Sequence, residues 1–255
     1  MLPSGAATSF AGMDARGKVA LVTGGARRVG RALSLALAEA GADVIVHYSS
    51  SRDEAARTVR EAQNYGVRAA AMQADLRRSA DIATLMARIE ADFGRLDILV
   101  NSAASFESAP FLEISESEWD EVLALNLKAP FLLTQHATPL LRRATQPTII
   151  NILDLSAFQP WPSYTHHSVS KAGLAHLTRI AARALAPEIR VNAIAPGTVL
   201  PPDDYNGIGS DATSDRRLVS QAGTPHDVVR ALFFLIESNF ITGQVVIVDG
   251  GRMLL

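Results

Sequence analysis

The stretch Val19-Ala20-Leu21-Val22-Thr23-Gly24-Gly25-Ala26-Arg27-Arg28-Val29-Gly30 decides the fold of this chain. It begins as a short apolar run, breaks into a glycine turn and continues into the helical pattern of residues 31–38. This order predicts a buried parallel strand, a tight turn and a helix. Backbone N–H groups of such a turn face an anion, and Gly24 and Gly30 present no Cβ to a pyrophosphate. The stretch therefore predicts a phosphate-binding turn, with an ordinary β-α turn as the alternative.

Length and composition limit both the fold and the partners. The chain has 255 residues, 48% of them hydrophobic, and a formal net charge of -2, which suits one large α/β domain. Because the sequence has no basic stripe, we expect a small-molecule substrate and no nucleic-acid partner. It has no cysteine, so we expect no disulfide and no metal site. No apolar run approaches the roughly 20 residues that cross a bilayer, and no signal peptide is evident, so we expect a cytoplasmic protein without membrane contact.

Short β-rich runs alternate with helical patterns along the rest of the chain. Alternation of this length predicts right-handed crossovers and a parallel sheet covered on both faces. We therefore expect a single-domain, doubly wound (Rossmann) α/β fold with about seven strands. After the first unit, the expected strands are 43–48, 68–72, 98–101, 148–152, 190–194 and 244–248, and the expected helices are 52–65, 79–93, 115–143, 168–186 and 225–237.

The ligand site of such a fold lies beyond the carboxyl ends of the strands. We therefore expect the loops after Thr23, Tyr48, Asn101, Ile152 and Ile194 to converge on it.

Two segments fall outside the alternation. Residues 1–16 are small and rich in Gly, Ala and Ser, which predicts a flexible leader before a domain formed by residues 17–255. Residues 198–223 are rich in Pro, Asp, Gly and Ser and show no clear periodicity. Long irregular segments in compact domains are usually lids or disordered insertions. Because this one follows the sixth strand at the ligand edge, we interpret it as a substrate lid, with a passive surface loop as the alternative.

Motifs at the ends of the expected strands resemble the short-chain dehydrogenase/reductase family. They span residues 18–251 in the family's order: Thr23-Gly24 with Gly30, Asn101-Ser102-Ala103, Asn126, Lys171, Asn192, Pro196-Gly197, and Thr242-Gly243 with Asp249-Gly250-Gly251. Arg28, where most members have glycine, is similar to the pteridine reductase and dihydromonapterin reductase branch. So are His47-Tyr48, Ala104-Ser105-Phe106 and Asp154. The resemblance implies an NADP(H)-binding oxidoreductase that assembles as a homotetramer through the helices at 115–143 and 168–186.

The residues after the second strand favour NADP(H) over NAD(H). An acidic residue there would bind ribose hydroxyls and repel a 2′-phosphate, whereas this chain has hydroxyl groups and a cation. Arg27 adds a guanidinium suited to phosphate oxygens. The serines also suit a helix cap. The resemblance adds contacts of Asp75-Leu76 with adenine and of Lys171 with the nicotinamide ribose. The expected cofactor-binding residues are Gly24, Arg27, Arg28, Val29, Gly30, His47, Tyr48, Ser49, Ser50, Ser51, Asp75, Leu76, Asn101, Ser102, Ala103, Lys171, Pro196 and Gly197.

The catalytic centre departs from the Tyr-x-x-x-Lys signature of the family. His167 stands where the resemblance places the proton-donating tyrosine, four residues before Lys171. Asp154 takes the place of the usual serine, as it does in pteridine reductases. A carboxylate beside an imidazole favours the imidazolium, which is a proton donor, while the charge of Lys171 opposes it. In relatives, the residue matching Asn126 helps to hold a proton-relay water.

Three functions stay open at this point. The first is an NADPH-dependent reductase of a pteridine-like heterocycle, because the resemblance implies that Phe106 stacks on a flat ring, an arrangement that contributes about 1 kcal/mol beyond burial. The second is a 3-oxoacyl or other carbonyl reductase. The third is a non-catalytic NADP(H)-binding sensor, because the tyrosine is replaced. The expected catalytic residues are Asp154, His167, Lys171 and Asn126, with Tyr164 and His166 as nearby alternatives, and the expected substrate residues are Arg28, Phe106, Asp154 and Tyr205.

Overall fold

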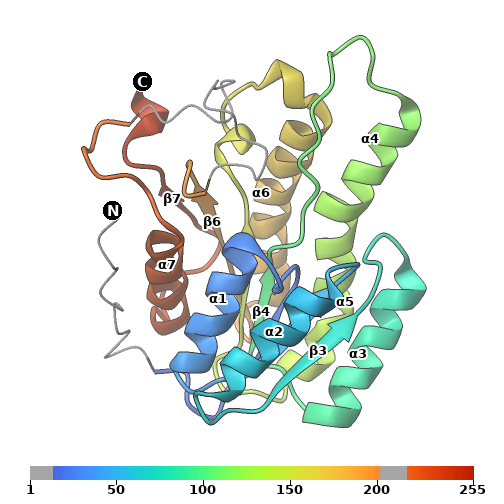
Figure 1. Ribbon diagram of the computed structural model, residues 1–255, viewed down its shortest axis with the longest axis vertical. Helices are drawn as coiled ribbons and strands as arrows, with labels where there is room; N and C mark the ends of the chain where they lie inside the picture. Colours follow the sequence, from blue (N-terminus) through green and yellow to red (C-terminus); the bar gives the residue numbers. More distant parts are fainter. Residues whose placement is uncertain (1–13, 201–216) are drawn as a thin grey trace.

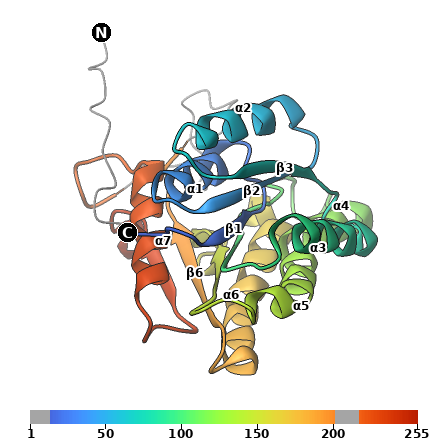
Figure 2. The same ribbon diagram turned by 90° about the horizontal axis from the view of Figure 1, so that it is seen from below.

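The computed structural model describes residues 14–200 and 217–255, which form a parallel sheet between two layers of helices (Figures 1 and 2). The seven strands lie in the order β3-β2-β1-β4-β5-β6-β7. All neighbouring pairs are parallel, which confirms the predicted doubly wound fold. The strands are β1 (Val19–Val22), β2 (Asp43–Tyr48), β3 (Ala69–Gln73), β4 (Ile98–Asn101), β5 (Thr148–Ile152), β6 (Arg190–Pro196) and β7 (Val245–Val248).

The helices cover the two faces of the sheet in two separate groups (Figure 2). One group consists of α1 (Arg28–Glu39), α2 (Arg52–Gln63) and α7 (Pro225–Glu237), and the other of α3 (Ser79–Phe93), α4 (Glu116–Leu123), α5 (Ala129–Leu141) and α6 (Thr165–Leu185). Because side chains alternate along a strand, β1 contributes to both cores. Ala20 and Val22 pack in the core with α1 and α7, whereas Val19 and Leu21 pack in the core with α3 and α5. Such two-sided burial explains the continuous apolar run of this strand.

The predicted helical region 115–143 is divided into three parts. Ser115 caps α4 with the predicted capping box, in which the Glu118 N–H donates to Ser115 Oγ at 3.2 Å. A π-helical segment, Ala124–Lys128, then separates α4 from α5 and buries Asn126. Short π-helical segments are frequent at functional sites.

The helix predicted to begin at residue 168 begins at Thr165. His167 consequently lies in the first turn of α6 instead of in the loop before it. The residues at this end carry no apolar periodicity, which is why the sequence pattern placed the start too late.

The N-terminal segment and the predicted lid are only partly described. Ala15 is buried, and its N–H donates to the Ala40 carbonyl at 2.9 Å, so the folded part begins before residue 17, earlier than expected. Within the predicted lid, residues 198–200 and 217–223 form neither helix nor strand. Tyr205, an expected substrate residue, lies outside the described residues.

Surface features bear on two further expectations. In the part of the chain that is described, no helix has the length and apolar character needed to cross a membrane. Three apolar side chains each leave a large part of their surface exposed: Phe131 on α5, and Val169 and Ile180 on α6. Assembly as a homotetramer through these helices stays a prediction.

Candidate active site

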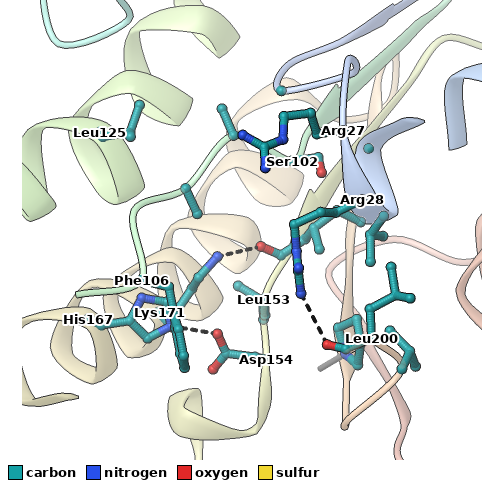
Figure 3. A pocket seen from close by; sticks show the side chains of 18 of the residues that line it. Arg27, Arg28, Ser102, Phe106, Leu125, Leu153, Asp154, His167, Lys171 and Leu200 are labelled. Atoms are coloured by element: carbon teal, nitrogen blue, oxygen red, sulfur yellow. Dashed lines mark hydrogen bonds and ion pairs between the residues drawn. The ribbon is translucent and has the colours of Figure 1, made fainter. Parts of the chain in front are cut away.

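A cavity of about 820 Å³ lies at the carboxyl ends of the strands, where the strand order reverses between β1 and β4. Ligands of doubly wound folds bind at this switch point. Figure 3 shows Arg27 and Arg28 together in one part of the cavity. Phe106, His167 and Asp154 gather in another part. The expected site residues that line the cavity are Gly24, Arg27, Arg28, Val29, Gly30, His47, Ser49, Asp75, Leu76, Ser102, Ala103, Phe106, Asp154, His167, Lys171, Pro196 and Gly197.

The turn between β1 and α1 depends on two glycines. Gly24 has a φ of +63°, and a Cβ added to it would lie 3.0 Å from the Cα of Ala103. A Cβ on Gly30 would overlap the carbonyl oxygen of Gly24. The turn is therefore packed too closely for side chains at these two positions, and its role in phosphate binding stays a prediction.

Arg28 adopts the backbone conformation that the family pattern gives to glycine. Its φ is +51°, in the left-handed region, which costs a non-glycine residue on the order of 1 kcal/mol. Its guanidinium donates to the Leu200 carbonyl at 3.1 Å (Figure 3). Arg28 thus connects the glycine turn to the beginning of the predicted lid.

His47 lies beneath the glycine turn with its ring buried. The Gly24 N–H donates to its Nδ1 at 3.1 Å, and its Nε2 lies 3.1 Å from the Ala74 carbonyl oxygen. Burial lowers the pKa of His47 to about 4, and the Ala74 carbonyl and the charge of Asp75 offset this only in part. The ring is therefore neutral at physiological pH, and both of its nitrogens are bonded to the backbone. The sequence predicted only a contact of His47 with the cofactor and did not predict these backbone contacts.

His167 is held between two acceptors. Its Nε2 lies 2.6 Å from Asp154 Oδ2 (Figure 3). Its Nδ1 lies 2.9 Å from the Ser105 carbonyl oxygen. The amide nitrogen of Asn126 also lies 3.3 Å from Nδ1. Both ring nitrogens are therefore held by polar neighbours.

Asp154 is ionised in this arrangement. Burial raises the pKa of its carboxyl, but the hydrogen bond and charge of His167, together with the charge of Lys171, outweigh burial and lower the pKa to about 2. Its other oxygen accepts the Ser156 N–H at 2.9 Å. The geometry therefore describes a hydrogen-bonded His167–Asp154 pair at the edge of the cavity.

Two buried residues, Lys171 and Asn126, form hydrogen bonds close to this pair. Lys171 Nζ donates to the Ile152 carbonyl at 2.8 Å, and burial lowers the pKa of its ammonium although Asp154 raises it. Asn126 accepts the Ser105 N–H at 2.8 Å and donates to the Ser105 carbonyl at 3.0 Å. The amide of Asn126 thus fixes the carbonyl that accepts from His167.

An aromatic cluster borders the His167–Asp154 pair. Phe106 stacks on Tyr164 with ring centroids 4.4 Å apart. Phe106 and His167 form a T-shaped pair with ring centroids 4.8 Å apart. Phe106 is 39% exposed and lines the cavity. Tyr164 and His166, the alternative donors, are not among the residues that line it.

The sequence patterns missed several residues of the cavity. Trp161 is buried and meets Phe106 edge-on at 6.5 Å. Arg252 is 8% exposed, donates to Thr198 Oγ1 at 3.0 Å and lies 5.7 Å from the Trp161 ring centroid. Arg252 follows β7, so extending the rule on strand ends to the last strand would have found it. No periodic signal marks Trp161.

Five expected site residues lie outside the lining of the cavity. Asn101 is buried and donates to Asn151 Oδ1 at 2.8 Å. The other four are Tyr48, Ser50, Ser51 and Asn126. Within the described ranges, no group of His, Asp and Glu residues is arranged to hold a metal ion.

The fold and this cavity define a class of protein, the short-chain oxidoreductases with a doubly wound sheet. The family described as enoyl-(acyl carrier protein) reductase matches residues 24–252. The chain therefore belongs to the short-chain dehydrogenase/reductase family, as its motifs predicted.

The relatives of the chain include both curated enzymes and solved structures. The chain is 35% identical over 244 residues to a 3-oxoacyl-[acyl-carrier-protein] reductase of Staphylococcus epidermidis, covering 93% of this chain and 99% of that enzyme. A dehydrogenase/reductase of Sinorhizobium meliloti is 36% identical, with a TM-score of 0.86 and coverage of 94% of this chain and 96% of that one. A short-chain dehydrogenase of Burkholderia cenocepacia in complex with NADP is 32% identical, with a TM-score of 0.86. The match covers 93% of this chain and 98% of that one.

Proposed function

We propose that this chain is an NADPH-dependent reductase of a flat, pteridine-like heterocycle and that the His167–Asp154 pair supplies the proton. The observation that carries the proposal is an ionised carboxylate, Asp154, in the same cavity as the ring of Phe106. A carboxylate accepts hydrogen bonds from ring N–H and amino groups, whereas it repels the negative charge that develops on a simple ketone oxygen. This chemistry favours a nitrogen heterocycle.

The residues of the cavity fit NADP(H). The glycine turn lines the cavity with Gly24 and Gly30, and the side chains of Arg27 and Arg28 line it beside them. Ser49, after β2, lines the cavity where an acid would exclude a 2′-phosphate. The NADP complex of the Burkholderia cenocepacia relative supports this choice of cofactor. When bound, NADPH supplies a hydride.

The proton is the part of the reaction that this chain's residues control. In the proposed reaction, protonated His167 carries the proton on Nε2, and Asp154 Oδ2 lies 2.6 Å away. The ionised Asp154 takes this proton and passes a proton to a ring nitrogen of the substrate, which leaves the carboxylate ionised again and the imidazole neutral. The Ser105 carbonyl, fixed by Asn126, holds the other side of the ring during this transfer.

The residues of the glycine turn and those after β2 also predict the cofactor preference. We expect NADPH to bind at least about tenfold tighter than NADH, a difference of about 1.4 kcal/mol, because cations and hydroxyl groups surround the predicted 2′-phosphate position. Fluorescence titration measures both affinities. Ser49→Asp places a carboxylate at this position and should reverse most of the preference. Equal affinities of the unmodified protein for the two dinucleotides would remove the argument.

The stacking role of Phe106 gives a prediction on the substrate. Phe106→Ala should raise the KM for dihydrobiopterin about fivefold or more, because the flat ring loses its aromatic contact. The affinity for NADPH should stay within a factor of about two. Phe111→Ala, which truncates an exposed phenylalanine outside the cavity lining, is the matched control and should leave KM unchanged. An unchanged KM in Phe106→Ala would count against the heterocycle.

A second candidate function is reduction of a 3-oxoacyl thioester. The Staphylococcus epidermidis relative of that activity, which is 35% identical to this chain, favours it. Initial rates of NADPH oxidation with dihydrobiopterin and with acetoacetyl-coenzyme A distinguish the two. Turnover of acetoacetyl-coenzyme A alone would replace the first proposal. Tight NADPH binding without turnover of either compound would instead favour a sensor of NADP(H).

A further inference from the structure

His47 joins three separate backbone segments at the base of the glycine turn. Its side chain accepts the Gly24 N–H at 3.1 Å, and its own carbonyl accepts the Gly25 N–H at 3.0 Å. On the other side of the ring, Nε2 lies 3.1 Å from the carbonyl oxygen of Ala74, which follows β3. One histidine thus connects the turn before α1 to the ends of β2 and β3.

These contacts require one form of the ring. Because Gly24 presents an N–H, Nδ1 must be the bare nitrogen that accepts it, and because Ala74 presents a carbonyl, Nε2 must carry the hydrogen. This is the neutral Nε2–H tautomer. Protonation would place a second N–H opposite the Gly24 N–H, so the two donors would repel each other.

The surroundings of His47 keep the ring neutral. The side chain is buried, and burial lowers its pKa from 6.5 to about 4. The charge of Asp75 acts in the opposite direction but does not overcome burial. The charged residues around this end of the cavity are Asp75 and Arg77 after β3 and Arg27 and Arg28 on the glycine turn. Asp75 is engaged with Arg77 at 2.9 Å, which limits its pull on the ring.

We propose that His47 is a positioning residue for the dinucleotide: its neutral imidazole accepts the Gly24 N–H and holds the glycine turn in the conformation that binds phosphate. Gly24 and Gly30 leave no room for a Cβ in this turn, so its conformation depends on backbone contacts such as the one between Gly24 and His47. His47 acts on the cofactor through this turn and not through a contact of its own with phosphate. The inference rests on the proposed NADP(H) cofactor and is independent of the substrate.

Two substitutions separate the hydrogen bond from the volume of the ring. His47→Asn keeps an acceptor, because Asn Oδ1 takes the place of His Nδ1 and does not titrate. His47→Leu keeps bulk and has no acceptor. At neutral pH we expect NADP⁺ to bind His47→Leu about tenfold more weakly than the unmodified protein, and His47→Asn within about threefold of it. His136→Asn makes the same substitution at an exposed histidine of α5 and is the control for replacing histidine by asparagine.

Two ligand-free measurements accompany the titration. Hydrogen exchange of the peptide that contains Gly24 should be faster in His47→Leu than in His47→Asn at the same pH. The pH dependence of stability is the second. A folded-state pKa of about 4, below the ordinary 6.5, means that stability is fully present above 6.5 and falls as the pH drops toward 4. The urea midpoint of the unmodified protein and of His136→Asn should therefore fall more steeply over this range than that of His47→Asn.

The outcomes are distinct. Weak binding and fast exchange in His47→Leu, with near-normal values in His47→Asn, support the positioning role. Equal loss in both variants shows that the ring acts through its volume, and normal binding by His47→Leu shows that the turn does not depend on it; either result overturns the inference. If the unmodified protein fails to bind NADP⁺, the proposed cofactor is wrong, and the exchange measurement still decides whether His47 holds the turn.

Discussion

His167→Phe should lower kcat by about 100-fold or more while leaving the affinity for NADP⁺ within about threefold, because general acid catalysis contributes factors of this size. Phenylalanine fills the space of the imidazole but carries no proton. It also leaves Asp154 without the hydrogen bond at 2.6 Å that it receives from His167. Steady-state rates with dihydrobiopterin and a fluorescence titration with NADP⁺ measure the two effects separately.

His167→Tyr is the matched variant for this experiment. It introduces the hydroxyl group that the family resemblance implies at this position and should retain activity. If His167→Phe keeps more than about a third of the activity, the proton comes from another group, and Asp154 acting through a water is then the first alternative. Activity that appears only in His167→Tyr would favour the sensor.

Gly30→Ala should weaken NADP⁺ binding by about 100-fold or more, because the added methyl group overlaps the carbonyl oxygen of Gly24. That atom belongs to the backbone of the phosphate-binding turn, so the conflict is relieved only if the turn itself moves. Titration with NADP⁺ measures the loss, and thermal unfolding shows whether the rest of the domain remains folded.

Gly94→Ala provides the control for Gly30→Ala. Gly94 ends α3 with a φ of +75°, and a Cβ there would meet nothing within 4 Å. We expect this variant to lose about 1 kcal/mol of stability, the cost of a strained backbone, and to bind NADP⁺ normally. Comparable losses of affinity in both variants would mean that Gly30 acts through general stability, contrary to the prediction.

The fold followed from the sequence because its signals are local and repeated. Apolar runs such as 98–101 and 148–152 are too short for helices and are buried on both sides, so alternation with helical patterns left few arrangements. The boundary errors have local causes as well. The π-helical segment around Asn126 changes the hydrogen-bond spacing without changing the apolar pattern, and the first turn of α6 has no apolar stripe.

The site was less accessible to sequence reasoning. Strand ends predicted where the ligand loops converge, and Asp154 and the glycine turn line one cavity there, together with Lys171 of α6, which the family resemblance indicated. The pattern did not give the partners of each ring nitrogen, because these depend on distances between elements far apart in the chain. For His47 the sequence suggested a contact with the cofactor, whereas the structure bonds its ring to Gly24 and Ala74.

The acceptor that orients His167 is the main-chain carbonyl of Ser105, and Asn126 binds both polar backbone atoms of that residue. A side chain at position 105 is therefore not needed to aim the imidazole. Phe106 is the next residue, so one loop carries both the aromatic ring that lines the cavity and the carbonyl that holds His167. A shift of this backbone to admit a larger ligand would therefore move the imidazole at the same time.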